Sequence, residues 1–280
     1  IANSVSSDRL FPWTLVKAFL SSPAALIETV TNRLKKTSEH TPEHQALQRL
    51  SDLITTITPK KSAKYQRLVD YLKSIGVAKG STMRVVVFSE RVATLTWLAQ
   101  HLAKDLKLAK GSIAIMHGGL SDQEQMRLVD EFKREDSPIR ILITGDVASE
   151  GVNLHAQCHQ LIHYDIPWSL IRIQQRNGRI DRYGQQYPPV ITTLLLDPAS
   201  ENAIGEVQVI ARLMEREHAA YKVLGDASSL MGEHSIKREE DAIREVLRGA
   251  RDFDDTVAKP EEILAHTDDN IDALLAMFAE

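Results

Sequence analysis

Four arginines that could bind an anion fall within eleven residues of this chain: Arg172, Arg176, Arg179 and Arg182. Arg179 and Arg182 are three residues apart, so on a helix they would lie on one face. Guanidinium groups keep their protons, and two of them side by side repel each other. A polyphosphate between them would relieve that repulsion, because planar guanidiniums bind phosphate oxygens in pairs. Gly178 would let the backbone come close to such a ligand.

The alternative interpretation of this stretch is a surface helix whose arginines pair with acidic neighbours. Asp165 and Asp181 lie close enough in the sequence to be those partners. Spacing alone favours neither interpretation. If the arginines bind an anion, Asp181 is more simply explained as a partner that orients Arg182 than as a general base.

Residues 144–153, which read TGDVASEGVN, form a second stretch that could bind a ligand. They contain two glycines, several small residues and polar groups able to contact hydroxyls. A loop of this composition can direct backbone N–H groups toward a phosphate or a sugar. The alternative is an ordinary turn between a strand and a helix.

Five short apolar runs, rich in β-branched residues, predict strands that are covered on both faces. Helical patterns of about a dozen residues separate most of them, which predicts βαβ units, a parallel sheet and an α/β fold. Ligands of such sheets lie at the carboxyl ends of the strands, where residues 144–153 would be. The predicted strands are residues 84–89, 113–116, 139–144, 160–164 and 190–196.

Helical patterns also flank this sheet region and predict three segments. Residues 1–80 are interpreted as a helical connector, residues 81–198 as the α/β lobe and residues 199–280 as an acidic helical extension. Residues 1–83 hold 12 Lys and Arg against 6 Asp and Glu, whereas residues 197–280 hold 9 against 20. The acidic surplus therefore belongs to the last third, where it indicates a solvated helical surface. The middle can still hold a locally basic groove.

Composition places the chain among ordinary globular proteins, with 43% hydrophobic and 26% charged residues. No apolar run approaches the roughly 18 residues that span a bilayer. The sequence does not open with a basic stretch followed by an apolar one, so we expect no secretory leader. The single cysteine, Cys158, fits a reducing, cytoplasmic setting and is expected to be a buried apolar residue. Because the chain begins with Ile1, we expect it to be a fragment of a longer polypeptide.

Three histidines recur every four positions, at His155, His159 and His163. They cross from a predicted loop into a strand, where side chains alternate between faces. The helical spacing is therefore illusory, and we expect no metal site.

Taken together and in order, several segments resemble the motifs of superfamily 2 helicases. The Tyr-Asp-Ile-Pro-Trp element and the Arg-Tyr-Gly-Gln ending are most similar to SWI/SNF-type translocases. Within these, the arginine motif resembles the bacterial branch that includes the RNA-polymerase-recycling ATPase; eukaryotic remodellers usually lack the glycine kept here as Gly178. The resemblance covers about residues 81–197. The matching segments are residues 85–90 (motif IV), 117–119 (the motif that follows it) and 144–153, 164–168 and 175–185 (motifs V and VI).

The resemblance implies a second RecA-like lobe that faces ATP and Mg²⁺ held mainly by a first lobe of the same polypeptide. Arg182 would be the arginine finger, and Arg179 would help to orient the γ-phosphate. Gly151 and Asn153 would lie near the ribose, and Gln175 would take part in the same cleft.

The resemblance also implies contacts with the phosphate backbone of one nucleic-acid strand. Ser89, His117, Gly118 and Thr144 would make these contacts, which carry little sequence information. Double-stranded DNA is the expected track, and RNA polymerase is an example of a possible protein partner.

Two motifs of a complete helicase are missing from the 280 residues. The sequence contains no Gly-x-x-x-x-Gly-Lys-[Ser/Thr] phosphate loop and no Asp-Glu-x-x motif at a strand end. We therefore expect the first lobe to lie outside this sequence and the chain alone to be unable to hydrolyse ATP. Two alternatives remain: a lobe of a strand-separating DNA or RNA helicase, and a non-catalytic module that binds a partner. The intact Arg179 and Arg182 argue against the second.

Overall fold

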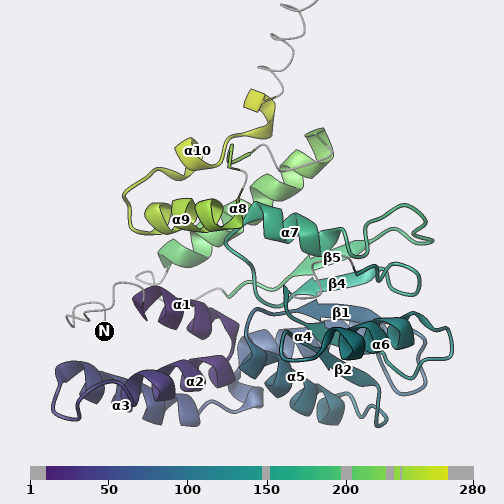
Figure 1. Cartoon of the computed structure of the whole chain (residues 1–280), viewed down its shortest axis with the longest axis horizontal. Helices are drawn as coiled ribbons and strands as arrows, with labels where there is room; N and C mark the ends of the chain where they lie inside the picture. The colour runs from purple at the N-terminus through teal and green to yellow at the C-terminus, as the bar shows by residue number, and fades with distance from the viewer. Residues whose placement is uncertain (1–10, 147–151, 197–203, 225–229, 234, 264–280) are drawn as a thin grey trace, which may run out of the picture. The chain divides into compact units, whose positions relative to one another are not determined.

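The computed structural model describes residues 11–146, 152–196, 204–224, 230–233 and 235–263 (Figure 1). Within them, five strands form one parallel sheet in the order β2-β3-β1-β4-β5. The predicted α/β fold, a RecA-like parallel sheet flanked by helices with further helices before and after it, is confirmed. The strands are β1 (Val85–Phe88), β2 (Ile113–Met116), β3 (Ile141–Thr144), β4 (Gln160–His163) and β5 (Val190–Thr193).

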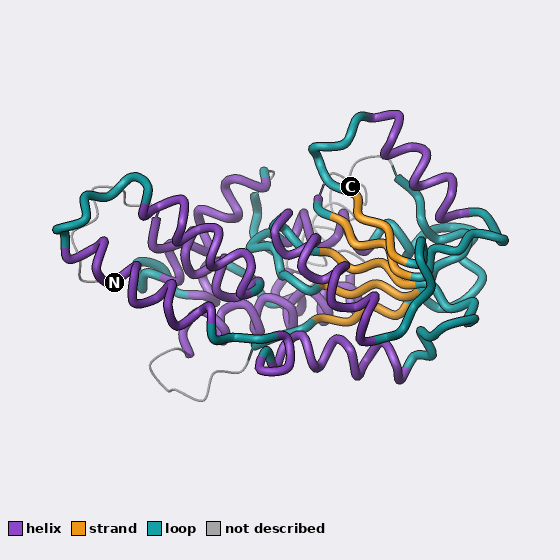
Figure 2. Tube along the Cα trace, turned by 90° about the horizontal axis from the view of Figure 1, so that it is seen from below, coloured by secondary structure: helices purple, strands orange, loops and turns teal. Residues whose placement is uncertain are grey.

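The five strands of the sheet lie side by side (Figure 2). Their alternate residues face two separate apolar layers. Val85 and Val87 of β1 pack against α4 (Ala63–Ser74) and α5 (Val92–Asp105). Val86 and Phe88 pack on the other face, where α6 (Asp122–Lys133) contributes Val129 and Phe132. Helix α6 begins with a capping box, because the side chains of Ser121 and Glu124 each accept a hydrogen bond from the other's backbone N–H group.

The N-terminal helices form a small core of their own. They are α1 (Phe11–Ser21), α2 (Pro23–Leu34) and α3 (Pro42–Thr55), followed by the short 3-10 helix η1 (Pro59–Lys61). Both α2 and α3 begin with a proline after a capping hydroxyl, that of Ser22 or Thr41. Their shared core contains Phe11, Ala18, Ala25, Leu26, Val30, Leu47 and Ile54.

The chain divides into two compact units. The first comprises Ile1–Asp165 and Arg176–Leu196, and therefore includes the sheet and the N-terminal helices. The second comprises Ile166–Gln175 and Asp197–Glu280. Helix α7 (Leu170–Asn177) starts in the second unit and ends in the first.

The second unit contains α8 (Ile204–Leu224), α9 (Ile236–Leu247) and α10 (Phe253–Thr256). Arg212 and Arg216 of α8 both pair with Asp254 of α10. The buried carboxylate of Glu239 accepts hydrogen bonds from the Ser169 hydroxyl, at 2.5 Å, and from the Ile171 N–H. Burial raises the pKa of Glu239, and these bonds oppose the shift.

Among the described residues, no helix combines the length and the apolar character required to cross a membrane.

Candidate functional site

Arg179 and Arg182 lie in turns rather than on a helix. Helix α7 ends at Asn177, and the N–H groups of Arg179 and Ile180 bond carbonyls three residues back, those of Arg176 and Asn177. The prediction that the two arginines share one helix face is therefore wrong. Gly178, directly after α7, interrupts the helix that arginine spacing alone would continue.

The turns that carry these arginines are bonded to the segment that follows β3. Arg179 donates to the carbonyl of Val152 at 2.9 Å, and its own carbonyl accepts from the N–H of Leu154 at 2.9 Å. Farther along, Gln185 donates to the carbonyl of Cys158 at 3.0 Å. Residues 152–158 and 179–185 therefore lie side by side.

Arg182 is exposed, and its guanidinium donates a hydrogen bond to the side-chain oxygen of Asn153 at 2.5 Å. Within the described residues, Arg182 forms no ion pair. Arg179 differs, because only 8% of its surface is exposed. Arg182 is thus a positive charge held at the surface by a neutral amide, which leaves that charge available to an anion.

Arg176 takes part in the site, although the sequence did not single it out for a role. Its side chain is fully buried and pairs with Asp146, just after β3, at 2.6 Å. It also donates to the carbonyl of Asp165 at 2.7 Å and lies over the Phe88 ring, 5.2 Å from its centroid. Arg176 therefore ties the carboxyl ends of β3 and β4 together. The sequence feature that could have identified Arg176 is Asp146. A parallel sheet brings the residues that follow β3 and β4 to one edge, where this carboxylate needs a positively charged partner.

Asp165, directly after Tyr164 at the end of β4, is the centre of a buried polar cluster. Its carboxylate accepts from the hydroxyls of Ser89, at 2.5 Å, and Ser21, at 2.7 Å. Lys64 lies 3.4 Å from the same carboxylate and donates to the carbonyl of Leu20. Burial lowers the pKa of Lys64, and Asp165 opposes that shift. This cluster joins the N-terminal helices to the carboxyl edge of the sheet.

His163, the last residue of β4, is buried and uncharged. Burial, with Arg176 nearby, lowers the pKa of His163 to about 3. Its Nε2 lies 2.8 Å from the amide oxygen of Asn177, so this nitrogen carries the proton. The ring also stacks on Phe88. A neutral imidazole therefore helps to hold the end of α7 against the sheet.

The remaining predicted site residues lie in different environments. Ser89 and Thr144 are fully buried, and Thr144 donates to the carbonyl of Gly145. His117 is half-buried, with its Nδ1 accepting from the Gly119 N–H at 3.0 Å, and Gly118 is exposed. Gly151 lies outside the described residues, and Gln175 belongs to the second unit. Their roles in binding stay predictions.

The sequence matches a known family and several curated proteins. Residues 63–184 match the helicase conserved C-terminal domain, starting within the segment interpreted as the connector. The uncharacterized ATP-dependent helicase YqhH of Bacillus subtilis is 26% identical over 84% of this chain and 39% of its own length. The RNA polymerase-associated protein RapA of Serratia proteamaculans is 30% identical over 44% of this chain and 12% of its own length. The chain thus spans well under half the length of these relatives.

A solved structure agrees at the level of the fold. The C-terminal part of the Fun30 ATPase domain superposes with a TM-score of 0.52 and 17% identity, covering 87% of this chain and 83% of that one. Together with the parallel sheet, this confirms the RecA-like fold that the motifs predicted. Residues 63–184 thus form a helicase conserved C-terminal domain with a RecA-like fold, the C-terminal lobe that the motifs predicted.

Proposed function

We propose that this chain supplies the second lobe of an ATP-driven nucleic-acid translocase and that Arg182 is its arginine finger. The observation that carries the proposal is the exposed guanidinium of Arg182, fixed by Asn153 without an acidic partner among the described residues. A cation held this way keeps its charge for phosphate oxygens and loses little freedom when it meets them.

Arg179 has a supporting role in this proposal. Its bonds to Val152 and Leu154 hold the segment that carries Asn153, and through it the side chain of Arg182. We also assign to Arg179 the orientation of the terminal phosphate when the two lobes close. Closure would complete the catalytic set, because Arg182 reaches the nucleotide only then.

ATP, bound with Mg²⁺, supplies the phosphoryl group whose transfer drives the movement, and we propose that the first lobe holds both. The contribution of this chain is positive charge, with the guanidinium of Arg182 as the group suited to phosphate. Gly151, Asn153 and Gln175 complete the proposed nucleotide-facing set.

Double-stranded DNA is the proposed track. His117 and Gly118, which are not fully buried, are the proposed contacts that can reach a strand in the conformation seen here. Ser89 and Thr144 would first have to be uncovered. The name of the relative RapA, an RNA polymerase-associated protein, supports RNA polymerase as a candidate partner in the cytoplasm.

The test uses the full-length polypeptide that joins this chain to its first lobe. Arg182→Ala should lower the ATPase rate stimulated by duplex DNA by about 10³-fold or more. Arg134→Ala is the matched control, because Arg134 is exposed and pairs with Asp136 in a loop after α6. It should leave the rate unchanged.

Other outcomes would favour the alternatives. Unchanged ATPase activity in Arg182→Ala would indicate a non-catalytic module that binds a partner. Displacement of a labelled strand would indicate a strand-separating helicase. Turnover by the isolated chain, lost in Arg182→Ala, would contradict the proposal that the first lobe holds the nucleotide.

A further inference from the structure

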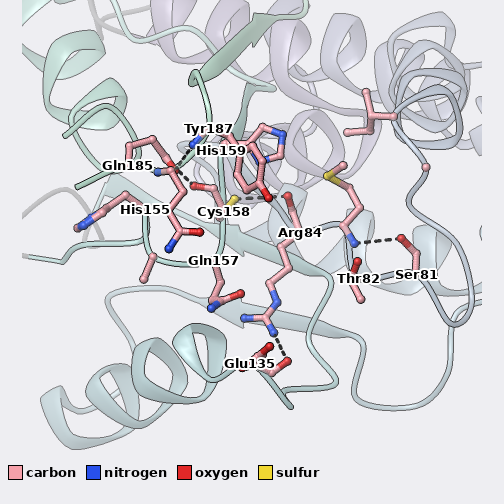
Figure 3. A pocket seen from close by; sticks show the side chains of 15 residues that line it. Ser81, Thr82, Arg84, Glu135, His155, Gln157, Cys158, His159, Gln185 and Tyr187 are labelled. Carbon is pink, nitrogen blue, oxygen red and sulfur yellow. Dashed lines mark hydrogen bonds between the residues drawn. The ribbon is translucent and has the colours of Figure 1, made fainter. Parts of the chain in front are cut away.

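A hollow of about 800 Å³ lies at the amino edge of the sheet, away from the site described above (Figure 3). Its lining includes Arg84, which directly precedes β1, and His159, which directly precedes β4. Gln185 and Tyr187, on the way to β5, close another side. Its volume falls in the range of small-molecule sites. All these residues belong to the first unit.

The hollow contains polar groups that have no partner in the described part of the chain. The Nδ1 of His155 is buried without a hydrogen-bond partner there. The amide of Gln157 forms no hydrogen bond with a described residue either. Figure 3 shows these two side chains around the same hollow. Because Gln157 is exposed, its amide offers both a donor and an acceptor to a bound molecule.

Aromatic surface is present beside these polar groups. Tyr187 is 62% exposed, and its ring lies 5.3 Å from that of His159, tilted by 43°. The loop that carries Tyr187 is fixed by Gln185, whose amide donates to the carbonyls of Cys158 and Ile180. Tyr187 therefore presents a ring face on a positioned loop, and such a face stacks with planar heterocycles.

The charges of the lining argue against an anionic ligand. The guanidinium of Arg84 is bonded to the carbonyls of Phe132, Arg134 and Glu135, so it is occupied. The lining also includes the acidic side chain of Glu135, whose carboxylate repels phosphate. An uncharged ligand fits this environment best.

We propose that the hollow binds an uncharged purine base of the adenine type, stacked on Tyr187 and paired along its edge with Gln157. A glutamine amide places a donor beside an acceptor, the pattern that adenine complements through its amino group and N7. The base can belong to a free nucleoside or to a single strand whose phosphates stay outside. The proposal is independent of the nucleotide cleft, because it uses none of its residues.

Calorimetric titration of the chain with adenosine tests this assignment. Wild-type protein should show saturable binding. Tyr187→Ala and Gln157→Ala should each weaken it by about tenfold. Tyr183→Ala is the matched control: Tyr183 is also an exposed tyrosine, four residues away and outside the hollow, so it should bind adenosine as the wild type does. Circular dichroism checks that each variant is folded.

Three results would overturn the proposal. The first is the absence of saturable adenosine binding. The second is binding that Arg182→Ala weakens and Tyr187→Ala does not, which would place the nucleoside in the nucleotide cleft. The third is tighter binding of AMP than of adenosine, which would contradict an uncharged ligand. A single-stranded deoxyadenosine oligonucleotide that displaces adenosine would identify a strand as the source of the base, and failure to displace it would identify a free nucleoside.

Discussion

Arg182 donates its hydrogen bond to Asn153, a neutral residue, across a gap of 29 positions in the sequence. Its neighbour in the arginine motif, Arg176, is instead buried against the carboxylate of Asp146. The charge of Arg176 is therefore compensated within the fold, whereas Arg182 is exposed and its positive charge is not compensated by a carboxylate among the described residues. The two arginines look equivalent in the sequence and are distinguished by their partners.

The neutral character of Asn153 leads to a first prediction for the full-length protein. Asn153→Asp should lower the kcat of ATP hydrolysis more than Asn153→Ala, because an added carboxylate cancels the charge of Arg182 as well as altering its position. We expect a loss of about ten- to a hundredfold for Asn153→Ala. Steady-state ATPase assays measure both. Gln45→Glu, the same exchange of amide for acid at an exposed site on α3, is the control. Equal rates for Asn153→Asp and wild type would disprove the role of Asn153.

Arg176 should be required for the stability of the lobe. Arg176→Met leaves Asp146 and the carbonyl of Asp165 without their buried partner, which should cost about 3–5 kcal/mol in the free energy of unfolding. Arg176→Lys should also be destabilising, because a single ammonium cannot reproduce the guanidinium fork. Urea denaturation followed by circular dichroism measures both.

Arg134→Met provides the matched comparison for Arg176. It removes an exposed ion pair with Asp136 and should cost less than about 1 kcal/mol. Equal losses from the two substitutions would show that burial does not govern the contribution of Arg176.

His163 predicts a pH dependence of stability. The pKa of its imidazole is about 3 in the folded chain, against about 6.5 when unfolded. Below about pH 6.5 the unfolded chain therefore binds a proton that the folded chain does not. This contribution to stability is complete above that pH and falls as the pH drops toward 3, by up to about 1.4 kcal/mol per unit.

The comparison variant is His163→Gln, which keeps a donor for Asn177 and does not titrate. Urea midpoints measured at several pH values between about 7 and 5 should decline less steeply for this variant than for the wild type. Parallel declines would mean that His163 is protonated in the folded chain.

Cys158 should be unreactive until the chain unfolds. Its thiol is 2% exposed, and burial raises its pKa to about 12, so almost no thiolate forms near neutral pH. Mass spectrometry after treatment with iodoacetamide should find the native chain unmodified and the urea-unfolded chain carrying one adduct. Because the chain contains a single cysteine, the mass shift reports this site alone. Rapid labelling of native protein would contradict the packing of the loop before β4.

The sequence predicts the sheet well because burial on both faces leaves a strong local signal. β2 starts and ends where the apolar run does, and the other strands are shorter than their runs by one to three residues. Residues 190–196 show the reason: pairing stops at Thr193, and Leu195 beyond it is 44% exposed. Apolar character marks where a strand can form, whereas neighbouring strands decide where it ends.

The site was predictable only in part. The motif spacing identified Arg179 and Arg182, but it could not show which arginine is buried. The buried position of Arg176 depends on its ion pair with Asp146, which lies thirty positions away in the sequence. Nor could it show that the Ser89 hydroxyl is bonded to Asp165. Such pairings depend on how distant segments meet at the strand ends, which periodicity does not encode.

The bond between Ser21 and Asp165 has a practical consequence for anyone trimming this protein for expression. A piece cut to residues 63–184 would keep the buried carboxylate and lose the hydroxyl of Ser21 and the carbonyl that Lys64 needs. Soluble yield should therefore improve when the cloned boundary is moved upstream of α1. Ser21, the last residue of α1, completes the buried polar cluster around Asp165, which a boundary at residue 63 would leave without this partner.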